Sequence, residues 1–291
     1  IQMPAAYLQD EHQIFREALR KFLQKEAVAY YDQWEKAGMV PRELWIKMGE
    51  QGFLCPWTDE KYGGSGVDFA YSVIINEELE KVGSSLIGIS LHNDIVVPYF
   101  DSYGTDELKQ RFLPTCVTGE TISAIAMTEP GAGSDLSPIK TTPIKQGDCY
   151  ILNGEKTFIT NGICADLIVV VCKTDPKAVP AHKGISLLVV ERDTPGFKRG
   201  RKLEKVGLHA QDTAELIFED AKVPAANLLG EEGKGFYYLM DKLQQERLLV
   251  AIGAQTSAER MLTIAKQYTK QRKAFGKSIS DFQTVQFRLA E

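Results

Sequence analysis

The spacing of apolar residues changes twice along this 291-residue chain, and that change is the strongest constraint on its fold. Up to about residue 120 the apolar residues recur three and four positions apart, as in Phe15, Leu19 and Leu23, which is typical of amphipathic helices. Short β-branched runs fill residues 121–232, and helical spacing returns from 233. The sequence therefore predicts an α+β fold: an N-terminal all-α domain at 1–120, a middle antiparallel β domain at 121–232 and a C-terminal helical bundle at 233–291. Because residue 291 lies inside a helical stretch, we expect this bundle to be truncated.

The predicted strands of the middle domain are short. They cover residues 121–128, 150–152, 157–160, 167–172, 185–191 and 214–219. Asn153-Gly154 separates the second run from the third, and both residues tolerate the positive φ that a type I′ turn requires. We therefore expect a two-residue hairpin there, with its two strands antiparallel.

Charge and cysteine content exclude several classes of protein. A net charge of -5, from 34 Lys and Arg against 39 Asp and Glu, argues against a nucleic-acid-binding surface. The longest apolar runs have the length of strands and are too short to span a membrane. Five cysteines without a CxxC pair favour a reducing compartment, and four widely separated histidines predict no metal site. The first residues resemble neither a secretory signal nor a transit peptide, so we expect that any targeting segment was removed or never existed.

A Gly-rich turn at residues 128–135 follows a predicted strand. Gly131 and Gly133 allow backbone N–H groups to approach an anion, and the hydroxyls of Thr128 and Ser134 are further donors. A nicotinamide fingerprint would read GxGxxG and open a helix, but Leu136 occupies the third glycine's place and a proline follows. The dinucleotide-fold interpretation fails, and a plain connecting turn is the other interpretation of this stretch.

Glu246 interrupts an apolar stripe on a predicted helix. Leu243 precedes it by three positions, and Leu249 and Val250 follow it by three and four, so the carboxylate shares a face with apolar side chains. Burying a carboxylate without a partner is costly, which makes an inward Glu a candidate for function. Alternatively, Glu246 pairs with Arg247 or Arg260.

Three motifs resemble those of the acyl-CoA dehydrogenase family, in order and in spacing: residues 128–135 (TEPGAGSD), 158–162 (FITNG) and 272–277 (RKAFGK). The resemblance extends to 104–114 and 207–214, and so covers nearly the whole chain. Residues 245–248 (QERL) and 230–238 look most like long-chain acyl-CoA dehydrogenases. Some members, including long-chain and isovaleryl types, keep their catalytic base at the position of Glu246, whereas others place it further along, beyond Glu291.

The resemblance implies an FAD site shared between two subunits. Its cofactor-binding residues would be Met127, Thr128, Gly133, Ser134, Phe158, Thr160, Arg272, Phe275 and Gln283. Thr128 would offer its hydroxyl to the reactive flavin nitrogen, Ser134 would bond the pyrophosphate, and Phe158 would lie against the flavin face. The last three residues would reach the FAD of a neighbouring subunit, which implies a homo-oligomer, a dimer of dimers. Without the resemblance, Phe158 is typical of a protein core and Arg272 of a solvated helix.

The same resemblance implies FAD-dependent α,β-dehydrogenation of a fatty acyl-CoA of the long-chain type to trans-2-enoyl-CoA. Glu246 would remove the α-proton, FAD would accept the β-hydride, and Ser134 and Arg247 would bind substrate. Electron-transferring flavoprotein would be the acceptor, in the mitochondrial matrix of a eukaryote or in bacterial cytoplasm. A flavin acyl-CoA oxidase and a short- or branched-chain dehydrogenase are alternatives. A non-catalytic acyl-CoA binder is disfavoured, because the base and the flavin contacts are all present.

The acyl tail of such a substrate needs an apolar channel near the base. We expect this channel between residues 86–97 and the helix that carries Glu246. Gly88 and Gly253 are small enough to leave space for the tail at this place.

Overall fold

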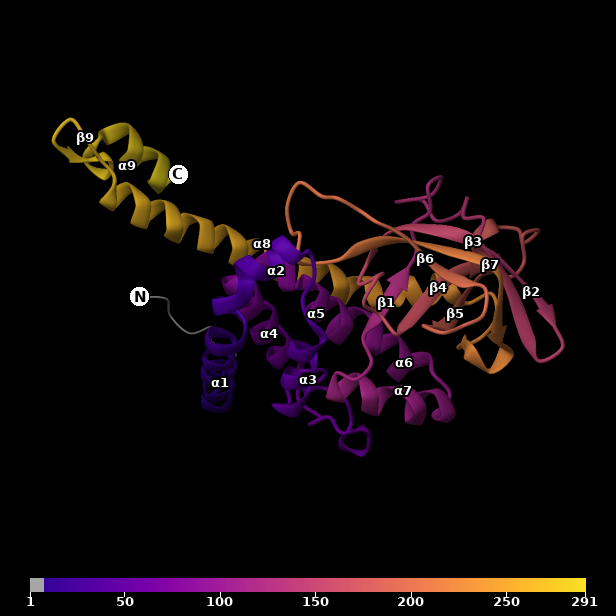
Figure 1. Ribbon diagram of the computed structural model, residues 1–291. Helices are drawn as coiled ribbons and strands as arrows, with labels where there is room; N and C mark the ends of the chain where they lie inside the picture. Colours follow the sequence, from indigo (N-terminus) through magenta and orange to yellow (C-terminus); the bar gives the residue numbers. More distant parts are fainter. Residues whose placement is uncertain (1–7) are drawn as a thin grey trace.

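A computed structural model describes residues 8–291, and Figure 1 shows the arrangement of its parts. Seven helices form one body, two β-sheets lie beside it, and the long helix α8 runs past both and projects beyond them. The helices of the first body are α1 (Asp10–Glu26), α2 (Tyr31–Ala37), α3 (Arg42–Glu50), α4 (Phe69–Val82), α5 (Ile87–Leu91), α6 (Val97–Tyr103) and α7 (Asp106–Thr118). The π-helical turn η4 (His92–Val96) joins α5 to α6, and 3₁₀ turns lie at η1 (Val28–Tyr30), η2 (Glu60–Tyr62) and η3 (Ser84–Leu86).

Helix α4 lies at the centre of the helical body. The carboxylate of Asp68 caps its first turn by accepting the backbone N–H of Ala70 at 2.9 Å. Helix α1 packs on one side of α4 and α8 on another, so residues all around α4, such as Ile74, Ile75 and Leu79, are buried. Because of this position, α4 can hold α8 in place.

The middle part consists of two packed four-stranded sheets. One has the order β1 (Ser123–Ala126), β4 (Leu167–Lys173), β5 (Ile185–Glu191), β8 (Leu228–Leu229); the other has the order β2 (Thr142–Gln146), β3 (Cys149–Thr160), β7 (Thr213–Pro224), β6 (Phe197–Lys202). Strand β1 pairs with β4 in parallel, and the other pairings of these two sheets are antiparallel. Val169 and Leu187 face the cluster that includes α6 and α7, while Val170 and Leu188 face the second sheet. This burial on both faces explains why β4 and β5 are uninterrupted apolar runs.

The hairpin predicted at Asn153-Gly154 is wrong, because both residues lie inside the continuous strand β3. The pairing of β3 with β7 is irregular at this point, as expected for a β-bulge. Gly154 has φ 147°, and a Cβ there would lie 2.4 Å from Oγ1 of Thr141. The two-residue connection lies instead at Gly147-Asp148, between β2 and β3. The conformational freedom of Gly154 therefore allows a β-bulge in β3 and the close approach of Thr141 to its backbone.

Helix α8 (Gly235–Gln271) packs on α4, η4 and α6 along its first part and is exposed at 261–268. We call residues 261–291 the arm; it also carries β9 (Lys273–Ala274), β10 (Lys277–Ser278), the turn η7 (Ile279–Asp281) and α9 (Gln283–Ala290) (Figure 1). Apolar side chains exposed on it include Met261, Ile264, Tyr268 and Phe287. The remaining 3₁₀ turns are η5 (Ala181–Gly184) and η6 (Ala225–Asn227).

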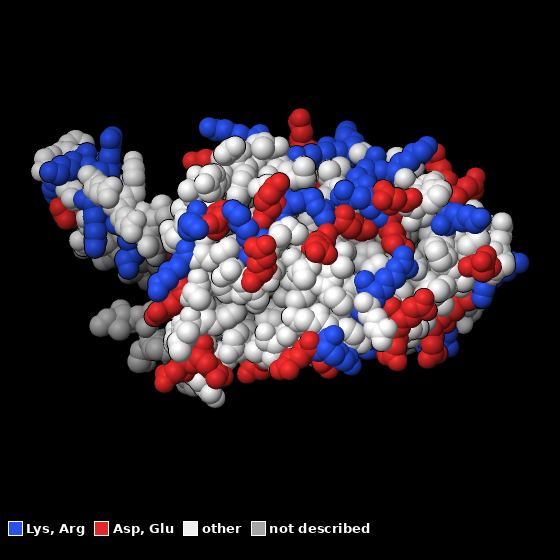
Figure 2. All heavy atoms as spheres, turned by 60° about the horizontal axis from the view of Figure 1, so that its bottom comes forward, with Lys and Arg blue, Asp and Glu red and all other residues white. Residues whose placement is uncertain are grey.

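The surface shown in Figure 2 carries acidic and basic side chains side by side over the main body. Basic side chains gather on the projecting arm, which includes Lys270, Arg272, Lys273 and Lys277. Among residues 8–291, no helix combines the length and apolar character needed to cross a bilayer. Over the same residues, no three His, Cys, Asp or Glu side chains group as a metal site would need.

Candidate active site

Glu246 lies on the face of α8 that is turned into the protein. Its neighbours along this face, Leu239 and Leu249, are buried, and Glu246 itself is 7% exposed. Its Oε1 accepts a hydrogen bond of 2.8 Å from the hydroxyl of Tyr99 on α6. Burial raises the pKa of this carboxyl, while the Tyr99 hydrogen bond and the positive charges of Arg247 and Lys242 act in the opposite direction. The group is thus a buried acid with one donor.

The alternative in which Glu246 forms an ion pair is wrong. Within the described residues Glu246 has no salt bridge. Arg247, the next residue on the helix, is exposed, and Arg260 donates to the backbone carbonyl of Val82 at 3.1 Å. The carboxylate of Glu246 therefore accepts a hydrogen bond from Tyr99 and forms no ion pair with Arg247 or Arg260.

Two hydrogen bonds from side chain to backbone fix the part of α8 around Glu246. Gln245 Nε2 donates to the carbonyl oxygen of Asp94 in η4 at 3.2 Å, and Asn76 Nδ2 of α4 donates to the carbonyl oxygen of Leu249 at 3.0 Å. Because both lie within three residues of Glu246, the rotation of the helix at the carboxylate is set by contacts with α4 and η4.

The Gly-rich turn leaves β1 and is held by a buried ion pair. Lys156, on β3 and 1% exposed, donates to Glu129 Oε1 and to the carbonyl oxygen of Met127, both at 2.9 Å. Glu129 also accepts the backbone N–H groups of Lys140 at 2.6 Å and Thr141 at 3.0 Å. Burial alone would raise the pKa of Glu129, but the charge of Lys156 and these hydrogen bonds hold it below its usual value. The buried Lys156–Glu129 pair therefore fixes the backbone of the turn to strand β3.

Phe158 stands out of the neighbouring strand. It has φ 59°, lies where the pairing of β3 with β7 shifts, and has a side chain that is 68% exposed. Thr157 N–H donates to the carbonyl oxygen of Thr128 at 2.9 Å, which brings the strand next to the turn. An exposed aromatic on strained backbone is a candidate for a ligand contact, because solvent exposure gives it no packing role.

The residues around this turn fit a flavin nucleotide. Among residues 8–291 the hydroxyls of Thr128, Ser134 and Thr160 have no hydrogen-bond partner. No atom lies within 4 Å of the position that a Cβ would take at Gly131 or Gly133, so their backbone is open to a ligand. Free hydroxyls, accessible glycine backbone and an exposed aromatic together can receive phosphate oxygens and a planar ring.

Several predicted site residues come together, and three do not. Met127 packs against the same core cluster as Tyr99 and Leu239, which joins the turn to the region of Glu246. Arg272, Phe275 and Gln283 lie on the arm, away from the turn (Figure 1). Phe275 is 95% exposed, with φ 52°. Their position is compatible with contacts to another subunit and not with contacts to the turn of their own chain.

The expected channel beside Gly88 is wrong. A Cβ at Gly88 would lie 2.3 Å from Oδ1 of Asn161, and Asn161 Nδ2 donates to the Gly88 carbonyl oxygen at 2.9 Å. Gly253 faces α4, where a Cβ would lie 3.3 Å from Oδ1 of Asn76. Both glycines permit close packing of polar side chains and leave no room for an acyl chain.

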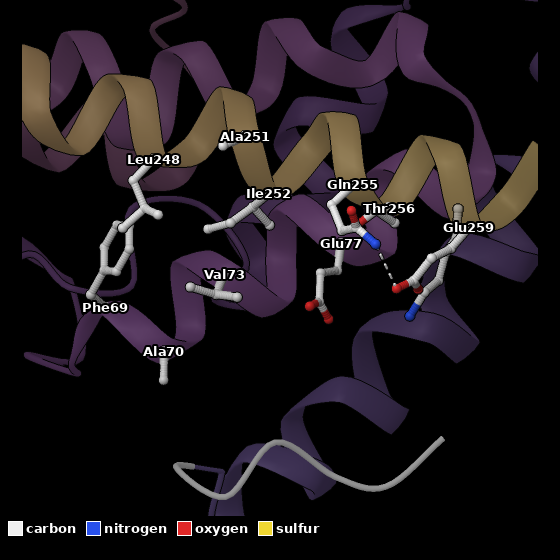
Figure 3. Close-up of a pocket in the computed structure, with 11 residues that line it drawn as sticks. Phe69, Ala70, Val73, Glu77, Leu248, Ala251, Ile252, Gln255, Thr256 and Glu259 are labelled. Carbon is white, nitrogen blue, oxygen red and sulfur yellow. Dashed lines mark hydrogen bonds between the residues drawn. The ribbon is translucent and has the colours of Figure 1, made fainter. Parts of the chain in front are cut away.

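A groove of about 540 Å³ lies instead between α4 and α8 (Figure 3). Phe69 and Val73 of α4 face Leu248 and Ile252 of α8, and the Gln255–Glu259 hydrogen bond of 3.2 Å lies at one end. Glu246 is not among its lining residues. Leu248 follows Glu246 by two positions, so the two side chains point in widely different directions from the helix.

Two residues of this region were missed from the sequence. Lys156 gave little signal, because Gly154 and Phe158, two positions away on either side of it in β3, are not buried. Tyr99 gave no signal, since a tyrosine within an apolar helix is typical of a core residue.

Comparison with known proteins assigns the chain to a family. Family descriptions match residues 9–120 (acyl-CoA dehydrogenase, N-terminal domain), 124–221 (middle domain) and 233–291 (C-terminal domain). The chain belongs to the acyl-CoA dehydrogenase family, which is flavin-dependent.

Two curated relatives and one solved structure illustrate the likeness. The chain is 53% identical over 282 residues to the mitochondrial long-chain specific acyl-CoA dehydrogenase of Sus scrofa, covering 97% of this chain and 65% of that protein. It is 39% identical over 288 residues to the mitochondrial isovaleryl-CoA dehydrogenase of Pongo abelii, covering 98% and 68%. A crystal structure of acyl-CoA dehydrogenase from Geobacillus kaustophilus is 75% identical with a TM-score of 0.97, covering 99% of this chain and 76% of that one. The chain thus spans slightly less than two thirds of the long-chain relative.

Proposed function

We propose that this protein catalyses FAD-dependent α,β-dehydrogenation of a fatty acyl-CoA to the trans-2-enoyl-CoA, with Glu246 as the catalytic base. The observation that carries this proposal is a buried carboxylate, raised in pKa by its apolar surroundings and hydrogen-bonded, among residues 8–291, through one oxygen only. A base of raised pKa is better matched to proton abstraction near neutral pH. Membership of a flavin-dependent family supports the same conclusion.

The residues of the turn would bind the cofactor. Thr128 and Thr160 would offer their free hydroxyls to the ring, Phe158 would stack on it, and Ser134 would bond the pyrophosphate. Met127 would line the ring, and the open backbone at Gly133 would allow close approach. When bound, FAD supplies the two-electron acceptor that removal of the β-hydride requires. The protein's own contribution is to orient the thioester, exclude water and hold the base.

The substrate proposed is a long-chain acyl-CoA, because identity to the long-chain enzyme exceeds that to the isovaleryl enzyme. Ser134 and Arg247, both exposed, would contact the CoA part. A branched or short acyl chain is the second candidate, supported by the 39% identity to isovaleryl-CoA dehydrogenase.

Assembly and electron transfer are also proposals. The exposed apolar residues of the arm and the basic side chains around Arg272 support a dimer of dimers in which Arg272, Phe275 and Gln283 reach a neighbour's FAD. Electron-transferring flavoprotein would be the electron acceptor. The mitochondrial relatives support a matrix location in a eukaryote, and the bacterial cytoplasm would be the alternative.

An anaerobic titration tests the proposal. In the purified, FAD-loaded protein the visible absorbance of the flavin should be lost on addition of acyl-CoAs of graded length. This loss should be fastest for the preferred chain length. Glu246→Gln should still bind FAD and acyl-CoA but should not bleach. Hydrogen peroxide formed in air would identify an oxidase, and a protein that binds no FAD or never bleaches would refute the proposal.

A further inference from the structure

The hydroxyl of Tyr99 reaches only one oxygen of Glu246. Tyr99 is 0% exposed, and its hydroxyl donates to Oε1 at 2.8 Å, the only hydrogen bond that it makes among residues 8–291. The other oxygen, Oε2, has no hydrogen-bond partner in the same part of the chain. The carboxylate therefore has one anchored oxygen and one that is available to a proton.

A proline next to Tyr99 links the two helices a second time. In an α-helix the carbonyl oxygen of Asp94 would accept the N–H of residue 98, but Pro98 has no N–H. Gln245 of α8 donates to that oxygen at 3.2 Å. Consecutive residues of α6, Pro98 and Tyr99, thus determine the partners of consecutive residues of α8, Gln245 and Glu246.

The π-helical turn η4 aims Tyr99 at this point. It precedes α6 directly, and the N–H of Val97 bonds the carbonyl oxygen of His92, five residues back. An extra residue in a helical turn rotates everything after it by about 100° around the axis. Without η4, Tyr99 would point away from the carboxylate that it now contacts.

We propose that Tyr99 is a positioning residue for the base: its hydroxyl holds Oε1 of Glu246 so that Oε2 faces the α-carbon of the substrate. The inference rests on the proposed function of Glu246. In the step considered, the α-C–H bond breaks, an O–H bond forms on Oε2, and the electron pair stays on the α-carbon. Oε1 can accept the phenol hydrogen bond before and after this transfer, so the carboxyl group need not reorient.

The other charged groups near the pair act mainly along α8. Burial raises the pKa of Glu246, and the positive charges of Arg247 and Lys242 oppose this shift. Burial also raises the pKa of Tyr99, followed by the effect of Glu246 and then by those of Tyr103 and Asp241. On the packed helices, Asp94 of η4 is buried with a pKa raised to about 7, and Glu80 of α4 is bonded by Ser84 and Ser257. Tyr99 is the sole hydrogen-bond donor to Glu246 among residues 8–291, so its removal should be visible in the titration of this carboxyl.

The test is Tyr99→Phe in the FAD-loaded protein. Loss of a donor to the charged form should raise the pKa of Glu246 by about one unit and move the acid limb of kcat/KM to higher pH by the same amount. Infrared titration of the carboxyl stretch, taken as the difference from Glu246→Gln, measures that pKa without turnover. On the alkaline plateau kcat should fall roughly tenfold with little change in KM, because Tyr99 contacts the base and not the substrate.

Tyr103→Phe is the matched control, because this neighbouring tyrosine bonds Asp241 at 2.5 Å and not Glu246. It should leave the pKa of Glu246 unchanged. A ring-fluorinated tyrosine at position 99, a stronger donor of the same shape, should shift that pKa downward, which provides a test even if Tyr99→Phe folds poorly.

The two failures are distinguishable. If Glu246→Gln turns over like the wild type, Glu246 is not the base and the proposed function fails at this residue. If Glu246→Gln is inactive while neither substitution at position 99 moves the infrared pKa or the plateau kcat, only the positioning role is overturned.

Discussion

The buried pair between Lys156 and Glu129 provides a sharp test of how the Gly-rich turn at residues 128–135 is held. Lys156→Met removes the ammonium that donates to Glu129 and to Met127 while keeping most of the side-chain volume. Breaking a buried ion pair by deleting one partner typically costs about 3–5 kcal/mol, because the other charge stays buried. Glu129 keeps its two backbone donors, Lys140 and Thr141, so we expect a value near the lower end, roughly 3 kcal/mol.

Unfolding by urea and by heat measures this cost. At about 2–4 °C per kcal/mol for a domain of 150–250 residues, the Tm should fall by roughly 6–12 °C. Glu129→Gln combined with Lys156→Met should recover part of the loss, since no unpaired charge remains. Lys198→Met is the control, because Lys198 pairs with Glu219 at the surface, where such a pair contributes about 0–1 kcal/mol.

The pH dependence gives a second reading of the same pair. The folded pKa of Glu129 is lowered, so its stabilising contribution is present above the ordinary Glu pKa and is lost as the pH falls through the folded value. In Lys156→Met burial should instead raise that pKa, and protonation then relieves the unpaired charge. The difference from the wild type should therefore be largest at a pH above that raised pKa and should narrow as the pH falls through it. A Tm loss no larger than that of Lys198→Met, at every pH, would refute the reasoning.

Three further outcomes are expected. Phe158→Ala should change unfolding by no more than about 0.5 kcal/mol, because the side chain is exposed, yet weaken FAD binding measured by flavin fluorescence; unchanged FAD affinity would count against the stacking role. Gly88→Leu should lower the Tm without altering chain-length preference, because its side chain would collide with Asn161; a selective loss of long substrates in a stable variant would contradict this. Burial lowers the pKa of His92 from its ordinary value of 6.5 to about 4. The free energy of unfolding should therefore fall by about 1.4 kcal/mol per pH unit as the pH drops from 6.5 to about 4. A His92→Asn variant whose stability falls with the same slope would exclude His92 as the cause.

Central strands were easier to predict than edge strands. β4 and β5 are buried on both faces, and their apolar runs are visible in the sequence. β2 contains Pro143, and β6 reads FKRGRK; both lie at the edge of their sheet, where composition is not constrained by burial. Local turn preference at Asn153-Gly154 was overridden by pairing across three strands, which only the assembled sheet specifies.

The amino-acid sequence alone determined the division into helical, β and helical parts, because hydrophobic period is a local property of the chain. It also identified Glu246 as misplaced on an apolar stripe, and the motif at 128–135 as a turn resembling that of the acyl-CoA dehydrogenase family. Only the tertiary structure decided which side chains form hydrogen bonds or ion pairs with the residues of these two regions. Tyr99 and Glu246 are 147 residues apart in sequence, and Lys156 and Glu129 are 27 apart. Such partners are fixed by helix rotation and strand register, which depend on packing between distant segments and leave no periodic trace in either segment.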